Sequence, residues 1–206
     1  MAGSDVLSTY ILASDIAAVD ADGVSTSQTP SGAGNLTITG ALASGGEATL
    51  VPARNVTVTS GGSSETGKNF TITGTDVNGN AVSEVIAGPG SSATVSTTKI
   101  FKVVTQVYVD AATAGAVTVG SGTTVSETIF AGRARIRGVY FVNSGSGGSL
   151  DFVNGNNGNT VMKLQTTGTA ATADYPDVPD DGVLCTDGAF VNCLAASFTA
   201  LTVFYN

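Results

Sequence analysis

Apolar and polar residues alternate along most of the chain, in short runs rich in Thr, Val and Ile that stop at Gly, Asn or Pro. Residues 69–120 show this pattern most clearly, with turn sequences at Asn78-Gly79 and Gly88-Pro89-Gly90. A period of two places successive side chains on opposite faces of a strand, and Asn-Gly accepts the positive φ of a tight hairpin turn. The pattern therefore predicts an all-β protein built from antiparallel sheets.

Strand signals recur about every ten residues from Asn35 onward, which is typical of β-sandwiches and barrels. In the first part of the chain, we expect strands at 35–39, 47–51, 54–59, 69–75, 81–87, 99–109 and 115–119. In the second part, we expect them at 125–130, 133–143, 149–153, 160–166, 183–186, 189–194 and 197–205.

The best internal boundary is Gly120-Ser121-Gly122. It separates two expected antiparallel β-sandwich or barrel-like domains, at 29–122 and 123–206. Each is small for a free-standing core, which favours support from neighbouring subunits. Residues 1–28 have no sheet-like turns, and we interpret them as an N-terminal arm and the start of a linker. The arm is either loosely helical or extended, and docks on a neighbour or on its own domain.

Composition sharpens this picture. Apolar residues make up 42% of the 206 residues, enough for a core, but charged residues make up only 12%. That is half the usual share of about 25%. Such a surface suits a subunit largely covered by neighbours, although a freely soluble Thr-rich sandwich is the alternative. The net charge of −8 argues against binding nucleic acid or an anionic membrane, since both are themselves negatively charged.

The start of the chain shows no secretory signal, and no run reaches the ~18 apolar residues of a membrane span. The two cysteines are Cys185 and Cys193. If Asp187-Gly188 forms a tight hairpin turn, Cys185 lies opposite Phe190 rather than Cys193. A disulfide stays possible, but two buried free thiols are the favoured interpretation. Synthesis in a reducing cytoplasm fits this usage.

Two acidic segments raise the question of a metal. Asp76-Val77-Asn78-Gly79-Asn80 begins like a calcium loop, but its glycine falls before the position that such a loop requires and the twelfth position is not Glu. A hairpin turn is favoured there. A second cluster contains five aspartates: Asp174, Asp177, Asp180, Asp181 and Asp187. A stiff, exposed, solvated loop is favoured over a Ca²⁺ or Mg²⁺ site, because the spacing matches no known ligand loop.

Positive charge is concentrated at one place. Arg133, Arg135 and Arg137 supply three of the eight positive charges, and on a strand all three side chains point to one face. One interpretation is a contact stripe that pairs with carboxylates on a partner subunit. The other is a solvated sheet edge that discourages aggregation. The residues alone do not choose between them.

Two parts of the chain resemble modules of tailed-bacteriophage virion proteins. The first module is carried by 27–30, 34–40, 53–59, the run Phe70-Thr71-Ile72-Thr73-Gly74-Thr75-Asp76, Glu84, 88–89 and 111–115. The second is carried by 137–144, Leu150-Asp151-Phe152 and 198–205. In that group, small β subunits decorate or cement the capsid shell, or belong to the neck, tail or fibre. The resemblance supplies no catalytic residues.

The expected function is therefore that of a non-enzymatic virion structural protein, first of all a capsid decoration or cement protein that stabilises the head by lattice contacts. The expected partners are the major capsid protein or other virion subunits, and further copies of the chain. The expected location is the virion, after assembly in the host bacterial cytoplasm. The alternatives are a neck, tail or fibre subunit, and a carbohydrate-binding β-sandwich, which would normally expose aromatic residues. An enzyme is least favoured; His-dependent catalysis is excluded because the chain has no His, and no cofactor is expected.

Overall fold

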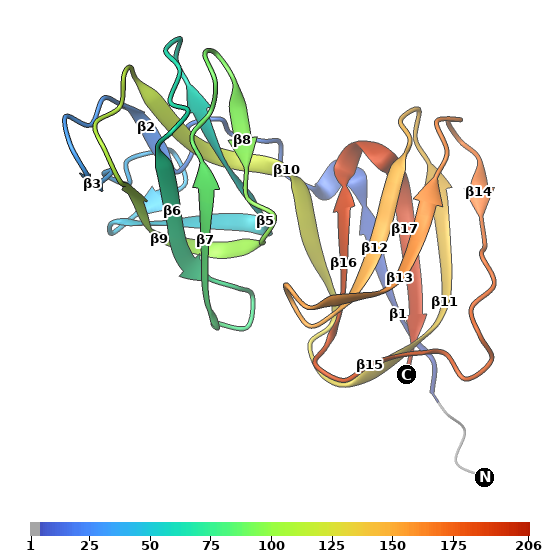
Figure 1. The fold of residues 1–206 in the computed structure, drawn as a ribbon. Helices are drawn as coiled ribbons and strands as arrows, with labels where there is room; N and C mark the ends of the chain where they lie inside the picture. The colour runs from blue at the N-terminus through green and yellow to red at the C-terminus, as the bar shows by residue number, and fades with distance from the viewer. Residues whose placement is uncertain (1–4) are drawn as a thin grey trace. The chain divides into compact units, whose positions relative to one another are not determined.

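The computed structural model describes residues 5–206 (Figure 1). The protein is nearly all β, with 55% of residues in strands and 3% in helices, and its strands form antiparallel sheets. The all-β prediction is confirmed. No helix among residues 5–206 is both long and apolar enough to cross a membrane.

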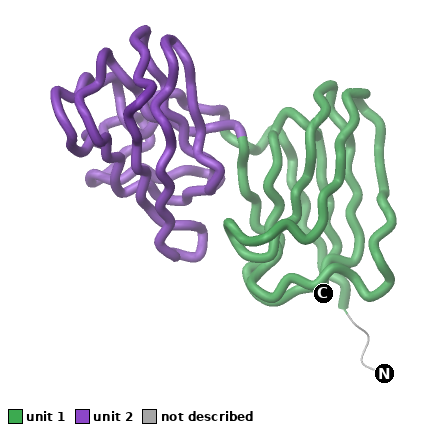
Figure 2. The backbone as a smooth tube through the Cα atoms, viewed as in Figure 1, with its two compact units in different colours: residues 1–17, 124–206 green, residues 18–123 purple. Residues whose placement is uncertain are grey.

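The chain forms two compact units (Figure 2). Unit 1 combines Met1–Ala17 with Thr124–Asn206, and unit 2 is the continuous segment Ala18–Thr123. The division after Thr123 lies one residue from the expected boundary. The expected arm at 1–28 is not a separate element, because its first part belongs to unit 1 and its second part to unit 2. Unit 2 is thus inserted between two parts of unit 1.

Unit 1 is a sandwich of a five-stranded layer and a four-stranded layer. The first layer, which we name the β1 sheet, has the order β1-β17-β11-β14, with β15 also paired to β11. Its strands are β1 (Leu7–Leu12), β11 (Ala134–Asn143), β14 (Ala173–Asp174), β15 (Val183–Cys185) and β17 (Phe198–Tyr205). The second layer, the β13 sheet, comprises the end of β10 (Val117–Phe130), β16 (Ala189–Leu194), β12 (Gly148–Asn154) and β13 (Asn159–Thr166).

Alternating residues of both layers meet in the core of unit 1. Leu201 and Val203 of β17 pack there with Phe141 of β11 and with Leu150 and Phe152 of β12. Two short 3-10 turns, η1 (Ala13–Asp15) and η2 (Ala195–Ser197), flank β1 and β17. Because β1 pairs with β17 over its whole length, the beginning and the end of the described chain lie side by side in one sheet.

Unit 2 has its own core, centred on Phe70, Ile72, Phe101 and Val107. Its main sheet has the order β10-β5-β9-β6-β7. The strands are β5 (Glu47–Ser60), β6 (Asn69–Thr75), β7 (Ala81–Ala87), β9 (Phe101–Val109) and the start of β10. Four short strands pair along it: β2 (Ser25–Gln28), β3 (Gly34–Asn35), β4 (Ala43–Ser44) and β8 (Thr94–Ser96).

Two long strands replace pairs of expected shorter ones. The segment β5 continues through Pro52, with a change of register between Thr49 and Arg54. The segment β10 continues through Gly120-Ser121-Gly122, where a boundary was expected. Its first part pairs with β2 and its second part with β16.

The glycines of β10 serve close packing rather than a turn. A Cβ at Gly120 would lie 2.2 Å from the carbonyl oxygen of Asp20, and one at Gly122 would lie 2.3 Å from Oδ1 of Asn55. No side chain fits at either distance. A glycine-rich sequence therefore lies inside a strand here, which explains why the pattern suggested a boundary between strands.

The hairpin considered at Asp187-Gly188, between 183–186 and 189–194, is not formed. The strand β15 pairs with β11, whereas β16 pairs with β12 and β10, so the Asp187-Gly188 turn carries the chain from one layer to the other. Gly188 has φ +100, and a Cβ there would lie 2.7 Å from the ring of Phe190. The residues of this turn do not distinguish a hairpin from a crossover between layers, because both begin with the same turn chemistry.

Candidate interaction surface on unit 1

The outer side of the β1 sheet carries a group of aromatic side chains from distant parts of the chain. Tyr10 of β1 and Tyr140 of β11 both lie opposite Thr202 of β17, one on each side. In the next row, Phe204 lies opposite Gly138. Inward residues alternate with these along β1 and β17, whereas β11 has a change of register between Ile136 and Gly138. We name Tyr10, Tyr140, Tyr175 and Phe204 the tyrosine face.

Tyr175 reaches this face from the segment after β14. A Cβ at Gly138 would lie 3.0 Å from Oη of Tyr175 and 3.5 Å from the ring of Phe204, so the absence of a side chain at Gly138 leaves room for both rings. Tyr175 is 67% exposed, Tyr10 59% and Tyr140 38%. Rings held on a sheet while still open to solvent are suited to bury surface against a partner at little entropic cost.

Two of the three predicted arginines lie at one end of the same sheet. Arg135 and Arg137 both lie against Gly182, whose ideal Cβ position is 3.4 Å from Cβ of Arg135 and 3.0 Å from Cδ of Arg137. Nη1 of Arg135 donates to the carbonyl oxygen of Asp181 at 3.0 Å. Arg133 is exposed in the turn before β11. Within residues 5–206, none of the three guanidinium groups forms an ion pair.

The edge interpretation does not hold for Arg135. Ala134 to Ile136 of β11 pair with β15 on one side, and Ile136 pairs with β17 on the other. The backbone of Arg135 also exchanges two hydrogen bonds with that of Asn206. Because the strand is paired on both sides around Arg135, this arginine protects no free edge. The role of the three arginines as a contact stripe stays a prediction.

The aspartates of 174–187 are dispersed. Asp174 accepts a hydrogen bond from Nδ2 of Asn143 at 2.5 Å, while Asp187 lies beside Asn154 and Thr186 at the other end of the segment. Asp177, Asp180 and Asp181 are exposed. No group of three His, Cys, Asp or Glu side chains between residues 5 and 206 is close enough together to hold a metal ion.

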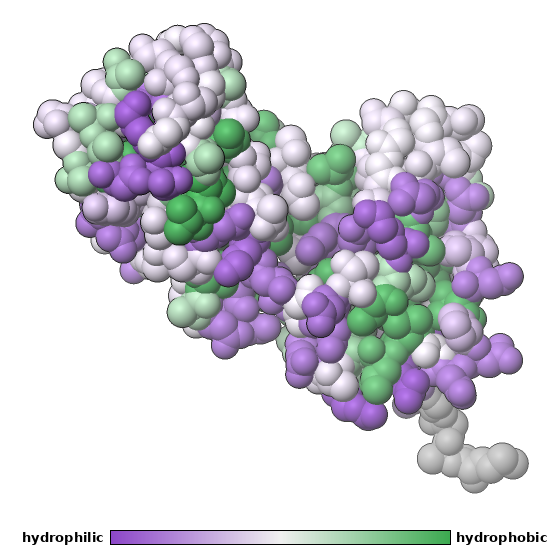
Figure 3. All heavy atoms as spheres, viewed as in Figure 1, coloured by the Kyte–Doolittle hydropathy of each residue, from purple (hydrophilic) through white to green (hydrophobic). Residues whose placement is uncertain are grey.

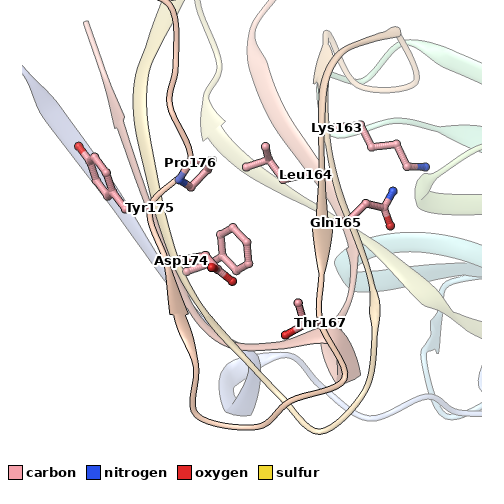
Figure 4. Close-up of a pocket in the computed structure, with 8 residues that line it drawn as sticks. Lys163, Leu164, Gln165, Thr167, Asp174, Tyr175 and Pro176 are labelled. Atoms are coloured by element: carbon pink, nitrogen blue, oxygen red, sulfur yellow. The ribbon is translucent and has the colours of Figure 1, made fainter.

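A cleft of about 360 Å³ lies where the sandwich opens between β13 and the segment 174–176. Figure 4 shows Leu164, Asp174 and Thr167 around the space, while Tyr175 points away from it. Its two charged groups are already engaged, Lys163 with Asp151 at 3.1 Å and Asp174 with Asn143. We interpret the cleft as a seam between the two layers of the sandwich.

Small apolar patches lie among hydrophilic residues on the visible face of both units (Figure 3).

The turn at Asp76 is a hairpin, as expected. It joins β6 to β7, and Oδ1 of Asp76 accepts the backbone N–H groups of Asn78 and Asn80. Gly79 has φ +81, and the second carboxylate oxygen accepts the side-chain amide of Asn80 at 3.1 Å. The carboxylate therefore holds the turn itself.

Both cysteines are free and buried, which confirms the favoured interpretation. Burial raises the pKa of the Cys185 thiol. Burial, with smaller contributions from the carboxylates of Glu127 and Asp151, raises the pKa of Cys193 to about 12. Thiols in this state are poor nucleophiles at neutral pH, because the thiolate is the reactive form.

No protein-family model matches this chain, and the curated proteins contain no significant match. The tyrosine face was not predicted from the sequence. Its members come from 10, 140, 175 and 204, and only the pairing of β1 with β17 and β11 brings them together. Tyr140 gave no local signal, because strict alternation places it on the face opposite Arg135 and Arg137. The change of register between Ile136 and Gly138 is what brings Tyr140 to the outer side.

Proposed function

We propose that this protein is a non-enzymatic structural subunit of a tailed-phage virion, with capsid decoration or cement as its first role. The observation that carries the proposal is the tyrosine face with Arg135 and Arg137 at its end. Tyrosine and arginine are enriched in the residues that contribute most to protein–protein binding. The resemblance of 27–115 and 137–205 to virion modules adds independent support.

The mechanism is adhesive. Tyr10, Tyr140 and Tyr175 bury their rings against the major capsid protein or another virion subunit. The guanidinium groups of Arg135 and Arg137 pair with carboxylates at the rim of that contact, where bidentate hydrogen bonds fix the orientation. Many copies on a lattice then bind with high avidity, although each single contact is weak.

The decisive experiment is co-sedimentation with capsids that lack the protein. We expect Arg135→Glu to abolish binding, because it reverses the charge at the contact. Lys102→Glu, the same charge change at a half-buried position in unit 2, is the matched control and retains binding. We expect Arg135→Glu to change the free energy of unfolding by less than about 1 kcal/mol, since the side chain makes one exposed hydrogen bond. Retained capsid binding by a folded Arg135→Glu protein contradicts the proposal.

Within the same class, a neck, tail or fibre subunit is distinguished by copy number. For a decoration protein, electron microscopy of the virion would count hundreds of copies. A neck, tail or fibre subunit would be present in a small number of copies that matches a ring or a threefold assembly.

A carbohydrate-binding role is the second candidate, and the exposed tyrosines favour it specifically. Aromatic rings on a sheet face can stack on the apolar side of a sugar ring. A glycan array separates the two roles, because the Tyr140→Ala protein loses a specific glycan signal only if that face binds sugar. Binding of capsids without any glycan signal favours the virion role.

A further inference from the structure

Strand β1 is an apolar, free edge of the β1 sheet. It pairs with β17 and with no other strand among residues 5–206. Val6 is 55% exposed, Leu7 51% and Tyr10 59%. An uncovered strand edge offers a row of backbone N–H and C=O groups to another strand. The apolar side chains beside that row add surface that a second strand would bury.

The other long edge strands carry the features that discourage such pairing. The edge strand β7 has Glu84 at its centre, and β13 has Lys163 together with a change of register against β12. The strand β1, with the sequence Leu-Ser-Thr-Tyr-Ile-Leu, has no charge and no proline. Its register with β17 is regular over all six residues. Edge charges and bulges are the common means of preventing strand addition, and β1 has neither.

The hydropathy of this segment is symmetric about Thr9. Reading outward from Thr9, Ser8 matches Tyr10, Leu7 matches Ile11, and Val6 matches Leu12. A two-fold axis at Thr9 would therefore place hydroxyl-bearing residues beside each other at the centre and apolar residues beside apolar ones at both ends. Only an axis that passes through a residue position keeps inward side chains beside inward ones, because side chains alternate with a period of two.

We propose that β1 pairs in antiparallel fashion with β1 of a second copy of this chain, around a two-fold axis at Thr9. The two β1 sheets then form one continuous sheet. Both tyrosine faces lie on the same side of it, which doubles the surface presented to a lattice. This interface locates the self-association that the proposed function expects. The dimer itself does not depend on that function; only its biological role rests on it.

The test uses light scattering after size-exclusion chromatography of the full chain. We expect the wild-type protein to move from a mass near 20.3 kDa to twice that mass as its concentration rises. Ser8→Lys with Tyr10→Lys places two like-charged pairs across the axis, since Ser8 of one copy lies opposite Tyr10 of the other. We expect the dissociation constant to rise by roughly tenfold or more.

A charge-complementary variant tests the register. Ser8→Lys with Tyr10→Glu sets opposite charges against each other if the axis is at Thr9, and we expect it to remain a dimer. If the axis were at Tyr10, the two introduced glutamates would meet and the dimer would dissociate. The matched control is Ser83→Lys with Val85→Lys on the edge strand β7, where both positions are exposed. We expect this variant to dimerise at the same concentration as the wild-type protein.

Three results would overturn the proposal. These are a wild-type protein that stays monomeric at high concentration, a double-lysine variant that stays dimeric, and a lysine–glutamate variant that becomes monomeric. Circular dichroism and thermal melting of each variant show that β1 remains folded onto β17. Capsid binding is measured separately on the wild-type protein, because Tyr10 also belongs to the tyrosine face. A wild-type monomer that binds capsids contradicts the dimer alone. A dimer that fails to bind capsids contradicts the proposed function alone.

Discussion

The two units differ in how many of their charged side chains are engaged by their own backbone. In unit 2, the carboxylates accept backbone N–H groups of the same unit, as Glu65, Asp76, Glu84 and Asp110 do. In unit 1, Arg137 and the exposed aspartates of 177–181 form no ion pair within residues 5–206. These four carboxylates of unit 2 therefore stabilise loops and turns, whereas unit 1 leaves Arg137 and the exposed aspartates of 177–181 on its surface. The comparison identifies unit 1 as the side of the protein on which to look for a partner.

Glu65 is the clearest example in unit 2. Its side chain is fully buried, pairs with Nζ of Lys68 at 2.8 Å, and accepts the N–H groups of Ala114 and Gly115 at 2.8 and 2.9 Å. Burial raises the pKa of Glu65, but the hydrogen bonds from Lys68, Ala114 and Gly115 outweigh it and hold the pKa below its usual value. One carboxylate thus joins the loop after β5 to the turn before β10.

The largest expected effect is that of removing this carboxylate. We expect Glu65→Ala to lower the free energy of unfolding of unit 2 by about 3 kcal/mol, because two backbone N–H groups and a lysine lose a fully buried acceptor. Scanning calorimetry would show a lower transition temperature. Glu47→Ala, an exposed position in the same unit, is the control and is near neutral. If Glu65→Ala and Glu47→Ala lowered the transition temperature equally, the Glu65 carboxylate would have no special role in stabilising unit 2, which would contradict the comparison of the units.

The next effect is a dependence on pH. Because the pKa of folded Glu65 lies below its ordinary value of 4.5, its contribution is complete above that value. It is lost as the pH falls through the lowered folded pKa. We expect the difference in melting temperature between wild type and Glu65→Gln to be constant near neutral pH and to shrink in acid. Asp110, whose pKa is lowered by the backbone and side-chain N–H groups of Asn69, acts in the same direction in both proteins. A difference that grows in acid contradicts this assignment.

The smallest effect tests whether the units open separately, although β10 runs through both. Burial raises the pKa of Cys193 to about 12, so alkylation at neutral pH requires unit 1 to open. We expect Glu65→Ala to leave the alkylation rate of Cys193 within about twofold of wild type. Peptide mass spectrometry measures that rate, and the Leu201→Ala protein, with a cavity in the core of unit 1, is the positive control. An increase in Glu65→Ala would show that opening spreads along β10.

Much of the local structure could be predicted from the sequence. The strand pattern over 69–75 and 81–87 was correct to the residue, because the Asn-Gly turn and strict alternation leave one register. The strand through Gly120 was missed, since a glycine needed for close packing cannot be distinguished locally from one needed for a turn. The tyrosine face was missed because its residues come together only across strand pairs.

The sequence by itself determined the β class, the turn at Asp76 and the alternation that turns Arg135 away from the core. These depend on neighbours along the chain, where side-chain period and turn chemistry act. Only the tertiary structure decided that β1 completes a sheet with β17, that unit 2 is an insertion, and that β11 is an interior strand. Those features depend on which distant strands pair. Burial and hydrogen bonding stabilise such pairs, and the entropic cost of closing the chain between them grows only slowly with its length.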